Sequence, residues 1–150
     1  MIIDTSAIIA CLGDEPDADS LTLKLVTAKT RRISCVQVLE CYTVISRRYG
    51  HDGLEYLKTF ISTNRIVEVA FDSNQRKLAC EAWQRFGKGS GHPAQLNFGD
   101  CAAYALARWT GEPLLFKGPI SRRPTSLRRD FAAAPGGSSQ PSHATCRSAP

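Results

Sequence analysis

The chain has 150 residues, of which 43% are hydrophobic and 22% are charged. This length supports one domain with a substantial core, and this composition excludes a wholly disordered chain. No run of about 18 apolar residues occurs, and Met1 is followed by a strand-like stretch rather than by a basic and then an apolar region. We therefore expect no membrane-spanning helix and no secretion signal, and we expect the protein to stay in the cytoplasm.

The positive charge is concentrated at the end of the chain. Residues 1–118 hold 14 Lys and Arg against 13 Asp and Glu, whereas residues 119–150 hold five Arg and one Asp. The same final segment contains five Pro, six Ser and few large apolar residues. It cannot bury enough surface to offset its ordering entropy. We expect a folded domain at 1–118 and a disordered tail at 119–150, whose basic charge is only weak evidence for nucleic-acid binding.

Strands and helices alternate along the first 116 residues. In chain order, the sequence predicts a strand at residues 1–4, helices at 6–12 and 16–28, a short extended segment at 32–35, helices at 36–49 and 52–63, a strand at 66–70, a helix at 73–86, a loop at 87–96, a helix at 97–110 and a strand at 114–116. This order predicts an α/β fold with a parallel sheet covered by helices on both faces. Ligand sites in such sheets lie beyond the carboxyl ends of the strands.

Six cysteines, at positions 11, 35, 41, 80, 101 and 146, include no C-x-x-C pair. Without a secretion signal, and without zinc-ligand spacing, they predict neither disulfides nor a structural zinc site. Most of them lie in apolar helical stretches, where a cysteine serves as a small core residue.

Two acidic residues lie where a strand ends or a helix begins. Asp4 ends the first strand, so it either caps the helix that follows or presents a carboxylate at the carboxyl end of a central strand. Asp100 lies three residues after Asn97, which suits a helix start, and it shares a face with Ala103 and Tyr104, which should point inward. An acid in this position can cap a helix and bind a metal at once.

Glu40 lies inside the helix predicted at residues 36–49. Val36 and Val44 flank it on its own face, and Tyr42 and Ile45 lie on the opposite face, so we expect the first turns of this helix to be buried nearly all round. A buried carboxylate is costly unless it meets a cation or a metal. Glu40 is therefore either a metal ligand or the partner of an arginine, unless it reaches the surface.

These three acids fall at the mouth of one sheet if the predicted topology holds. Carboxylate clusters suit hard cations such as Mg²⁺ or Mn²⁺, which activate water and neutralise phosphate oxygens in phosphodiester cleavage. The three histidines, at positions 51, 92 and 143, match no zinc spacing, and no nucleotide-binding or serine-hydrolase motif occurs.

The sequence resembles the PIN-domain endoribonucleases, in particular the VapC toxins of VapBC toxin–antitoxin pairs. The resemblance covers residues 1–118 and rests on the segments at 1–7 (MIIDTSA), 38–40 (VLE), 87–96 (GKGSGHPAQL), 96–101 (LNFGDC) and 112–118 (EPLLFKG). It implies a three-layer α/β/α fold and RNA cleavage that depends on Mg²⁺ or Mn²⁺. By similarity, Asp4, Glu40 and Asp100 would hold the metal and orient the attacking water.

The resemblance also implies partners. These are an RNA substrate, a second copy of the chain in a homodimer, and a cognate VapB-like antitoxin that inserts a segment near the acidic site. Candidates for contacts with RNA phosphates are Arg31, Arg32, Lys88 and Lys117.

The chain departs from the family pattern after Gly118. The family usually places a further Asp just after the last strand, whereas here Pro119 and Ile120 follow. Residues 119–130 can be back-translated with allowed codons that, in a shifted frame, encode Asp-Phe-Ser-Pro-Thr-Asp-Ile-Ala-Pro-Ala and then a stop. We therefore expect the tail to be a reading-frame artefact, and we expect activity to be impaired by loss of the last acidic residue.

Two other functions stay open from the sequence. One is a non-catalytic PIN-like protein that binds only an antitoxin or RNA. The other is a phosphatase that uses Asp4 as a nucleophile, although such families generally carry a second acid two residues later, where this chain has Ser6.

Overall fold

A computed structural model of the chain describes residues 1–117. Its strands, all parallel, form one sheet in the order β3-β2-β1-β4: β1 (Ile2–Ile3), β2 (Arg32–Ser34), β3 (Val67–Val69) and β4 (Leu114–Leu115). Its helices are α1 (Thr5–Leu12), α2 (Ala18–Thr27), α3 (Cys35–Thr63), α4 (Ser73–Phe86) and α5 (Phe98–Thr110). The tail predicted at residues 119–150 lies outside the described residues.

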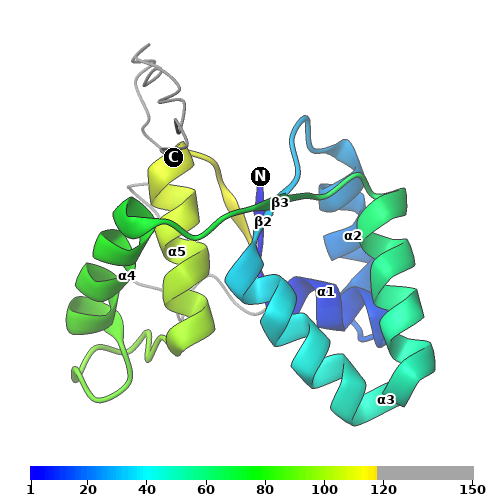
Figure 1. Cartoon of the computed structure of the whole chain (residues 1–150), viewed down its shortest axis with the longest axis horizontal. Helices are drawn as coiled ribbons and strands as arrows, with labels where there is room; N and C mark the ends of the chain where they lie inside the picture. The colour runs from blue at the N-terminus through cyan, green and yellow to red at the C-terminus, as the bar shows by residue number, and fades with distance from the viewer. Residues whose placement is uncertain (118–150) are drawn as a thin grey trace, which may run out of the picture.

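The helices cover both faces of the sheet. In Figure 1 the sheet is seen nearly edge-on, with α4 and α5 on one side and α1, α2 and α3 on the other. This arrangement confirms the predicted α/β/α architecture. The carboxyl end of β1, the start of α3 and the start of α5 all lie at the lower edge of the sheet in this view.

The two helices predicted at 36–49 and 52–63 run on as a single element, α3, with a sharp bend at Gly50. Gly50 has φ 64° and ψ −150°, a backbone conformation that no helix contains. Glycine adopts this region without the steric penalty that a Cβ brings, so the chain can reverse there. The predicted stop at Gly50 is therefore confirmed as a bend that folds α3 back on itself (Figure 1).

The main core lies between the sheet and the helices α1 to α3. Ile2 and Ile3 of β1 are 0% and 1% exposed, so the central strand is enclosed on both faces. A smaller cluster between α4 and α5 is built around Phe86 and Tyr104, whose rings meet edge to face at 6.0 Å. Burial of this kind fixes the direction of β1 and hence the place where Asp4 emerges.

The cysteines in the described range are all free thiols. Cys41 and Cys101 are buried, as expected for small core residues, but Cys80 is exposed, and Cys146 lies beyond residue 117. Burial raises the pKa of the Cys41 thiol to about 12, which makes it unreactive. No helix within residues 1–117 has the length and apolar character needed to cross a membrane.

Arg31 joins the ends of two helices. Its Nε donates to the carbonyl of Leu25 at 2.8 Å, and its Nη2 donates to Val26 at 2.9 Å and to Ala28 at 3.3 Å. Its Nη1 donates to the carbonyl of Asn64, just after α3, at 2.8 Å. All three guanidinium nitrogens are thus occupied by backbone carbonyls, so the structure favours a structural role over the predicted contact with RNA.

We predict that Arg31→Lys lowers the free energy of unfolding by about 2 kcal/mol, because a lysine ammonium cannot reproduce a fork that reaches four carbonyls. Urea denaturation followed by circular dichroism measures the loss. Arg48→Lys, at an exposed position of α3, is the matched control and should change stability little. Equal stability of the two variants would show that the Arg31 network contributes nothing.

Candidate functional site

Asp4 lies at the carboxyl end of β1 and begins α1. It is 3% exposed and serves as the N-cap of α1, with its Oδ1 accepting from the Ser6 backbone N–H at 2.9 Å. The Ser6 hydroxyl also donates to Oδ1. The expectation that Asp4 caps a helix and the expectation that it is presented at a strand end are therefore both met.

Gln37 holds the other oxygen of Asp4. It lies in the first turn of α3, is 0% exposed, and donates from Nε2 to Asp4 Oδ2 at 3.0 Å. Its Oε1 is buried and accepts no hydrogen bond from residues 1–117. The amide thus fixes the carboxylate from the side opposite Ser6.

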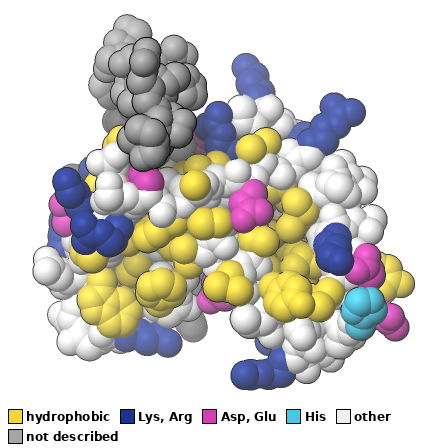
Figure 2. Space-filling model, viewed as in Figure 1, with side chains coloured by type: hydrophobic (Ala, Val, Ile, Leu, Met, Phe, Trp, Pro, Cys, Tyr) yellow, Lys and Arg dark blue, Asp and Glu magenta, His cyan; other side chains and the backbone are white. Residues whose placement is uncertain are grey.

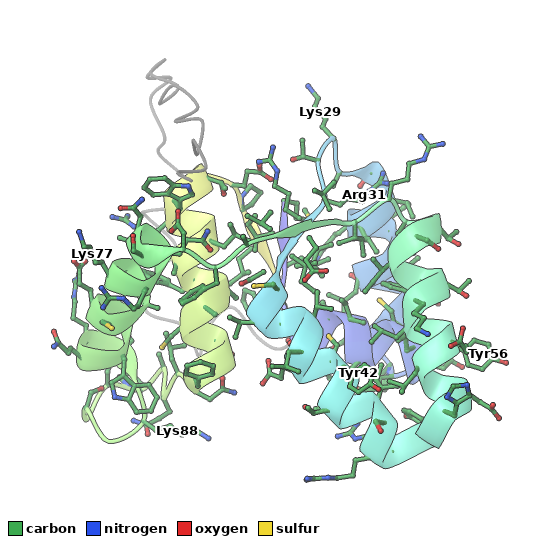
Figure 3. The ribbon with its side chains drawn as sticks, in the orientation of Figure 1. Lys29, Arg31, Tyr42, Tyr56, Lys77 and Lys88 are labelled. Carbon is green, nitrogen blue, oxygen red and sulfur yellow. The ribbon has the colours of Figure 1, made fainter. Side chains whose placement is uncertain are left out.

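Glu40 lies one turn farther along α3, on a helix that is less buried than expected. Cys41 and Ile45 are buried, but Leu39 is 64% exposed and Tyr42 is 50% exposed, so the prediction of a helix buried nearly all round is wrong. The helix buries the stripe of Gln37, Cys41 and Ile45 and leaves the side with Tyr42, labelled in Figure 3, exposed. Glu40 lies at the boundary and pairs with no arginine within residues 1–117; the Thr5 hydroxyl donates to its Oε2 at 2.7 Å.

The pKa of Glu40 is raised above its ordinary value of 4.5. Desolvation by burial is the largest cause, the charges of Asp4 and Asp100 add to it, and the hydrogen bond from Thr5 opposes it. Because both aspartates act on Glu40, the three predicted acids face one region of the molecule.

Asp100 reaches this region from the start of α5. Asn97 is the N-cap, its side chain accepts from the Asp100 N–H at 2.8 Å, and Asp100 Oδ2 accepts from the Asn97 N–H at 2.8 Å. This is a capping box, so the predicted helix start is confirmed. Ala103 and Tyr104 are buried, so the inward stripe below Asp100 is confirmed as well.

Gly99 makes room for the Glu40 carboxylate. A Cβ at Gly99 would lie 2.7 Å from Cδ of Glu40 and 2.8 Å from its Oε1, and it would be closer still to Oε2. Any side chain at position 99 would therefore push Glu40 away from the start of α5. The absence of a Cβ is what brings the acids of α3 and α5 together.

Glu40 opens onto a groove of about 450 Å³ lined by α3 and the start of α5. Its walls include Leu39, Glu40 and Thr43 on one side and Phe98 and Gly99 on the other. No three Asp, Glu, His or Cys side chains among residues 1–117 are arranged closely enough to hold a metal ion by themselves. Asp4 and Asp100 therefore act on Glu40 as neighbouring charges, and the three acids do not form a closed cage.

The remaining predicted phosphate contacts lie apart from one another. Arg32 pairs with Glu112, and Lys117 pairs with Glu15. Lys88 is exposed on the loop that follows α4 (Figure 3). Of the four candidates, Lys88 is the one that the structure leaves best placed to meet a ligand.

Three residues of this region were missed in the sequence. Gln37 lies on the buried stripe of its helix, four residues before Cys41, and a polar side chain in an apolar stripe is the signal that could have found it. Thr5 directly follows Asp4, and Gly99 directly precedes Asp100. The contacts that these two residues make with Glu40 depend on the packing of segments that are distant in the sequence.

We predict that Glu40→Gln stabilises the metal-free protein at neutral pH, by about 1 kcal/mol or less because Glu40 is partly solvated. An acid with a raised pKa destabilises the folded state once it ionises. The gain should therefore disappear as the pH falls below 4.5, where glutamate is protonated in both states. Thermal melts at several pH values measure it, with Glu68→Gln on exposed β3 as the control. A lower melting temperature would mark Glu40 as a structural ion-pair partner.

Three comparisons identify the family. The model of the PIN domain family matches residues 1–123. Ribonuclease VapC of Mycolicibacterium smegmatis is 43% identical over 122 residues, which cover 81% of this chain and 94% of that protein. Ribonuclease VapC28 of Mycobacterium tuberculosis is 46% identical over 118 residues, which cover 79% of this chain and 89% of that protein.

A solved structure agrees with the fold. VapC20 of Mycobacterium tuberculosis, described as a toxin that cleaves the sarcin-ricin loop, matches with a TM-score of 0.64 over 79% of this chain and 90% of that chain. At 16% identity this match bears on the fold alone. The family match and the identities above show that the chain belongs to the PIN domain family and, within that family, to the VapC group.

Proposed function

We propose that the chain is the toxin of a VapBC-type toxin–antitoxin pair and cleaves RNA phosphodiesters with Mg²⁺ or Mn²⁺. The observation that carries the proposal is that the charges of Asp4, at the carboxyl end of the central strand, and of Asp100, at the start of α5, both act on Glu40, which lines an open groove. The relatives are named as ribonucleases, which supports RNA cleavage as the reaction.

The residues present fit a hard divalent cation. They offer carboxylate oxygens, and Gly99 leaves the Glu40 carboxylate room to lie beside the start of α5, where Asp100 follows. Mg²⁺ usually keeps several waters and binds through one or two carboxylates together with substrate phosphates, so it does not require a closed protein cage. When bound, such an ion activates water and neutralises charge on the phosphate.

The three acids differ in how firmly the protein holds them. Asp4 is fixed from two sides by Ser6 and Gln37, and Asp100 is fixed by its own helix cap, so these two are suited to holding the ion. Among the described residues Glu40 is held at one oxygen, by Thr5, and its pKa is raised, so we assign it the orientation of the attacking water and the acceptance of its proton.

The same proposal includes the partners. A VapB-like antitoxin would bind near the acidic site. The protein would act in the cytoplasm, where its RNA substrate is found. A homodimer is supported by the large apolar side chains that α3 leaves exposed, Leu39 and Tyr42.

The alternatives have uneven support. The loss of the family's last acid favours a PIN-like protein that binds without cleaving, so this alternative stays as the second candidate. The phosphatase alternative gains no support, because Ser6, two residues after Asp4, is not an acid and uses its hydroxyl to hold Asp4 in place.

We predict that Asp4→Asn and Asp100→Asn each reduce cleavage at least about a hundredfold in a chain with the restored family ending, because each removes a charged metal ligand. Asparagine is as good an N-cap as aspartate, so the fold should survive at position 4. Cleavage of labelled RNA with Mg²⁺ measures the effect. Asp19→Asn on α2 is the matched control. Cleavage that persists in both site variants, or in excess chelator, would refute the assignment.

The end of the described chain lies beside the acidic site. The Lys117 N–H donates to the Ser6 hydroxyl at 3.0 Å, and that hydroxyl donates to Asp4. An acid within a few residues of Lys117 is therefore well placed to join the site, which supports the proposal that the missing Asp matters. The shifted-frame ending itself falls on residues outside the described range.

We predict that the chain as given cleaves RNA slowly or not at all and that replacing residues 119–150 by the shifted-frame ending restores cleavage. The restored Asp adds the negative charge that the metal site lacks. Comparing Mg²⁺-dependent cleavage by the two chains tests this. Ile120→Asp alone is a weaker rescue, because Pro119 constrains the backbone beside it. Gene sequencing decides whether the alternative codons exist. A folded tail that activity requires would overturn the idea.

A further inference from the structure

A second pocket adjoins the acidic groove, with Phe98 as the wall between them. Phe98 lines both the groove that contains Glu40 and a pocket of about 320 Å³ between α4 and α5. Trp83, Arg76 and Gln84 of α4 line that second pocket. The two hollows are thus neighbouring parts of one surface.

The aromatic walls of this pocket are open to solvent. Phe98 is 73% exposed, and Trp83 is 46% exposed. The capping box of Asn97 and Asp100 holds the start of α5, so the fold does not need a large side chain at position 98 to begin that helix. Figure 2 shows hydrophobic side chains gathered over α4 and α5, with Lys and Arg side chains at their border. Contiguous exposed apolar surface of this kind marks a binding site.

The chemistry of the lining suits a nucleobase with its phosphate. Exposed aromatic rings stack on bases, an amide can bond a base edge, and a guanidinium can meet a phosphate or stack. The Arg76 side chain has no ion pair with any other residue in the part of the chain the structure describes. The α4 helix also carries three basic residues against one acid, so it attracts an anionic strand and disfavours a second copy of itself.

We propose that Trp83 and Phe98 form a nucleobase-binding subsite next to the acidic groove. A phosphate held at the acidic groove would leave an adjoining base beside Phe98, where it stacks on the aromatic pair while Arg76 meets the backbone. The subsite takes a single-stranded RNA segment, because only an unpaired base can enter the pocket. This inference rests on the proposed function for the identity of the ligand as RNA.

The experiment measures binding without cleavage. The probe is a short single-stranded oligoadenylate titrated with Mg²⁺ into the full chain as given, which is expected to cleave slowly or not at all, and fluorescence is read in a Trp109→Phe background, where Trp83 is the only tryptophan. We expect the RNA to quench Trp83. The same oligonucleotide with abasic positions keeps its phosphates, so it should bind about tenfold more weakly and quench little.

Variants separate stacking from general affinity. Trp83→Leu and Phe98→Leu should each weaken oligoadenylate binding about tenfold, measured by fluorescence anisotropy of a labelled probe. Trp83→Phe and Phe98→Tyr keep a ring and should retain most of the affinity, which also guards against a folding defect. Trp109→Leu, which removes a half-exposed tryptophan from the far end of α5, is the matched control.

Each other outcome overturns the subsite. Equal binding of normal and abasic RNA, or equal affinities of Trp83→Leu and Trp109→Leu, would show that only the backbone is bound. Conversion of a dimer to a monomer by Phe98→Leu in light scattering, with RNA binding unchanged, would assign the pocket to a second copy. Failure of the proposed nuclease function is seen separately, as absent cleavage by the restored chain while base-dependent binding persists.

Discussion

The candidate site depends on the placement of one carboxylate at the end of a fully enclosed strand. The β1 strand is only two residues long, yet it lies between β2 and β4 and is covered on both faces, so its direction is fixed by the core. Asp4 is the next residue and is held on opposite sides by Ser6 and Gln37. Because α3 and α5 begin at this same edge, Glu40 of α3 and Asp100 of α5 lie near the fixed Asp4 carboxylate.

Two close contacts then bring the other acids to Asp4. Thr5, the next residue after Asp4, donates to Glu40 and so ties α3 to the start of α1. Gly99 lets the same carboxylate approach α5, where Asp100 lies one residue farther on. The small residues beside the acids therefore matter as much as the acids, since they set how near the three charges can come.

Much of this could be predicted from the sequence because local signals agree with the fold. Alternation of apolar strands with capped helices gave the right architecture, and Gly50 and the Asn97–Asp100 cap were read correctly because their signals are local. The exposure of Leu39 could not be predicted, because the sequence of an apolar helix face is the same whether that face packs on a sheet or faces solvent. The role of Arg31 was missed for a similar reason: its four carbonyl partners come together only in the tertiary structure.

The sequence left a choice between helix capping and a role as a presented carboxylate for Asp4, whereas for Asp100 it allowed capping and metal binding together; in the structure capping leaves both carboxylates able to take a cation. Each caps a helix by accepting backbone N–H groups, and a carboxylate has lone pairs left for a cation after doing so. Glu40 lies within α3 rather than at its start, and within residues 1–117 a single hydroxyl, that of Thr5, donates to it. Burial raises the pKa of Glu40, and the charges of Asp4 and Asp100 add to that rise, so the ionised form of Glu40 is held at a cost to the fold. A cation beside Glu40 would relieve that cost, so a ligand at this point would stabilise the fold as well as serve the chemistry.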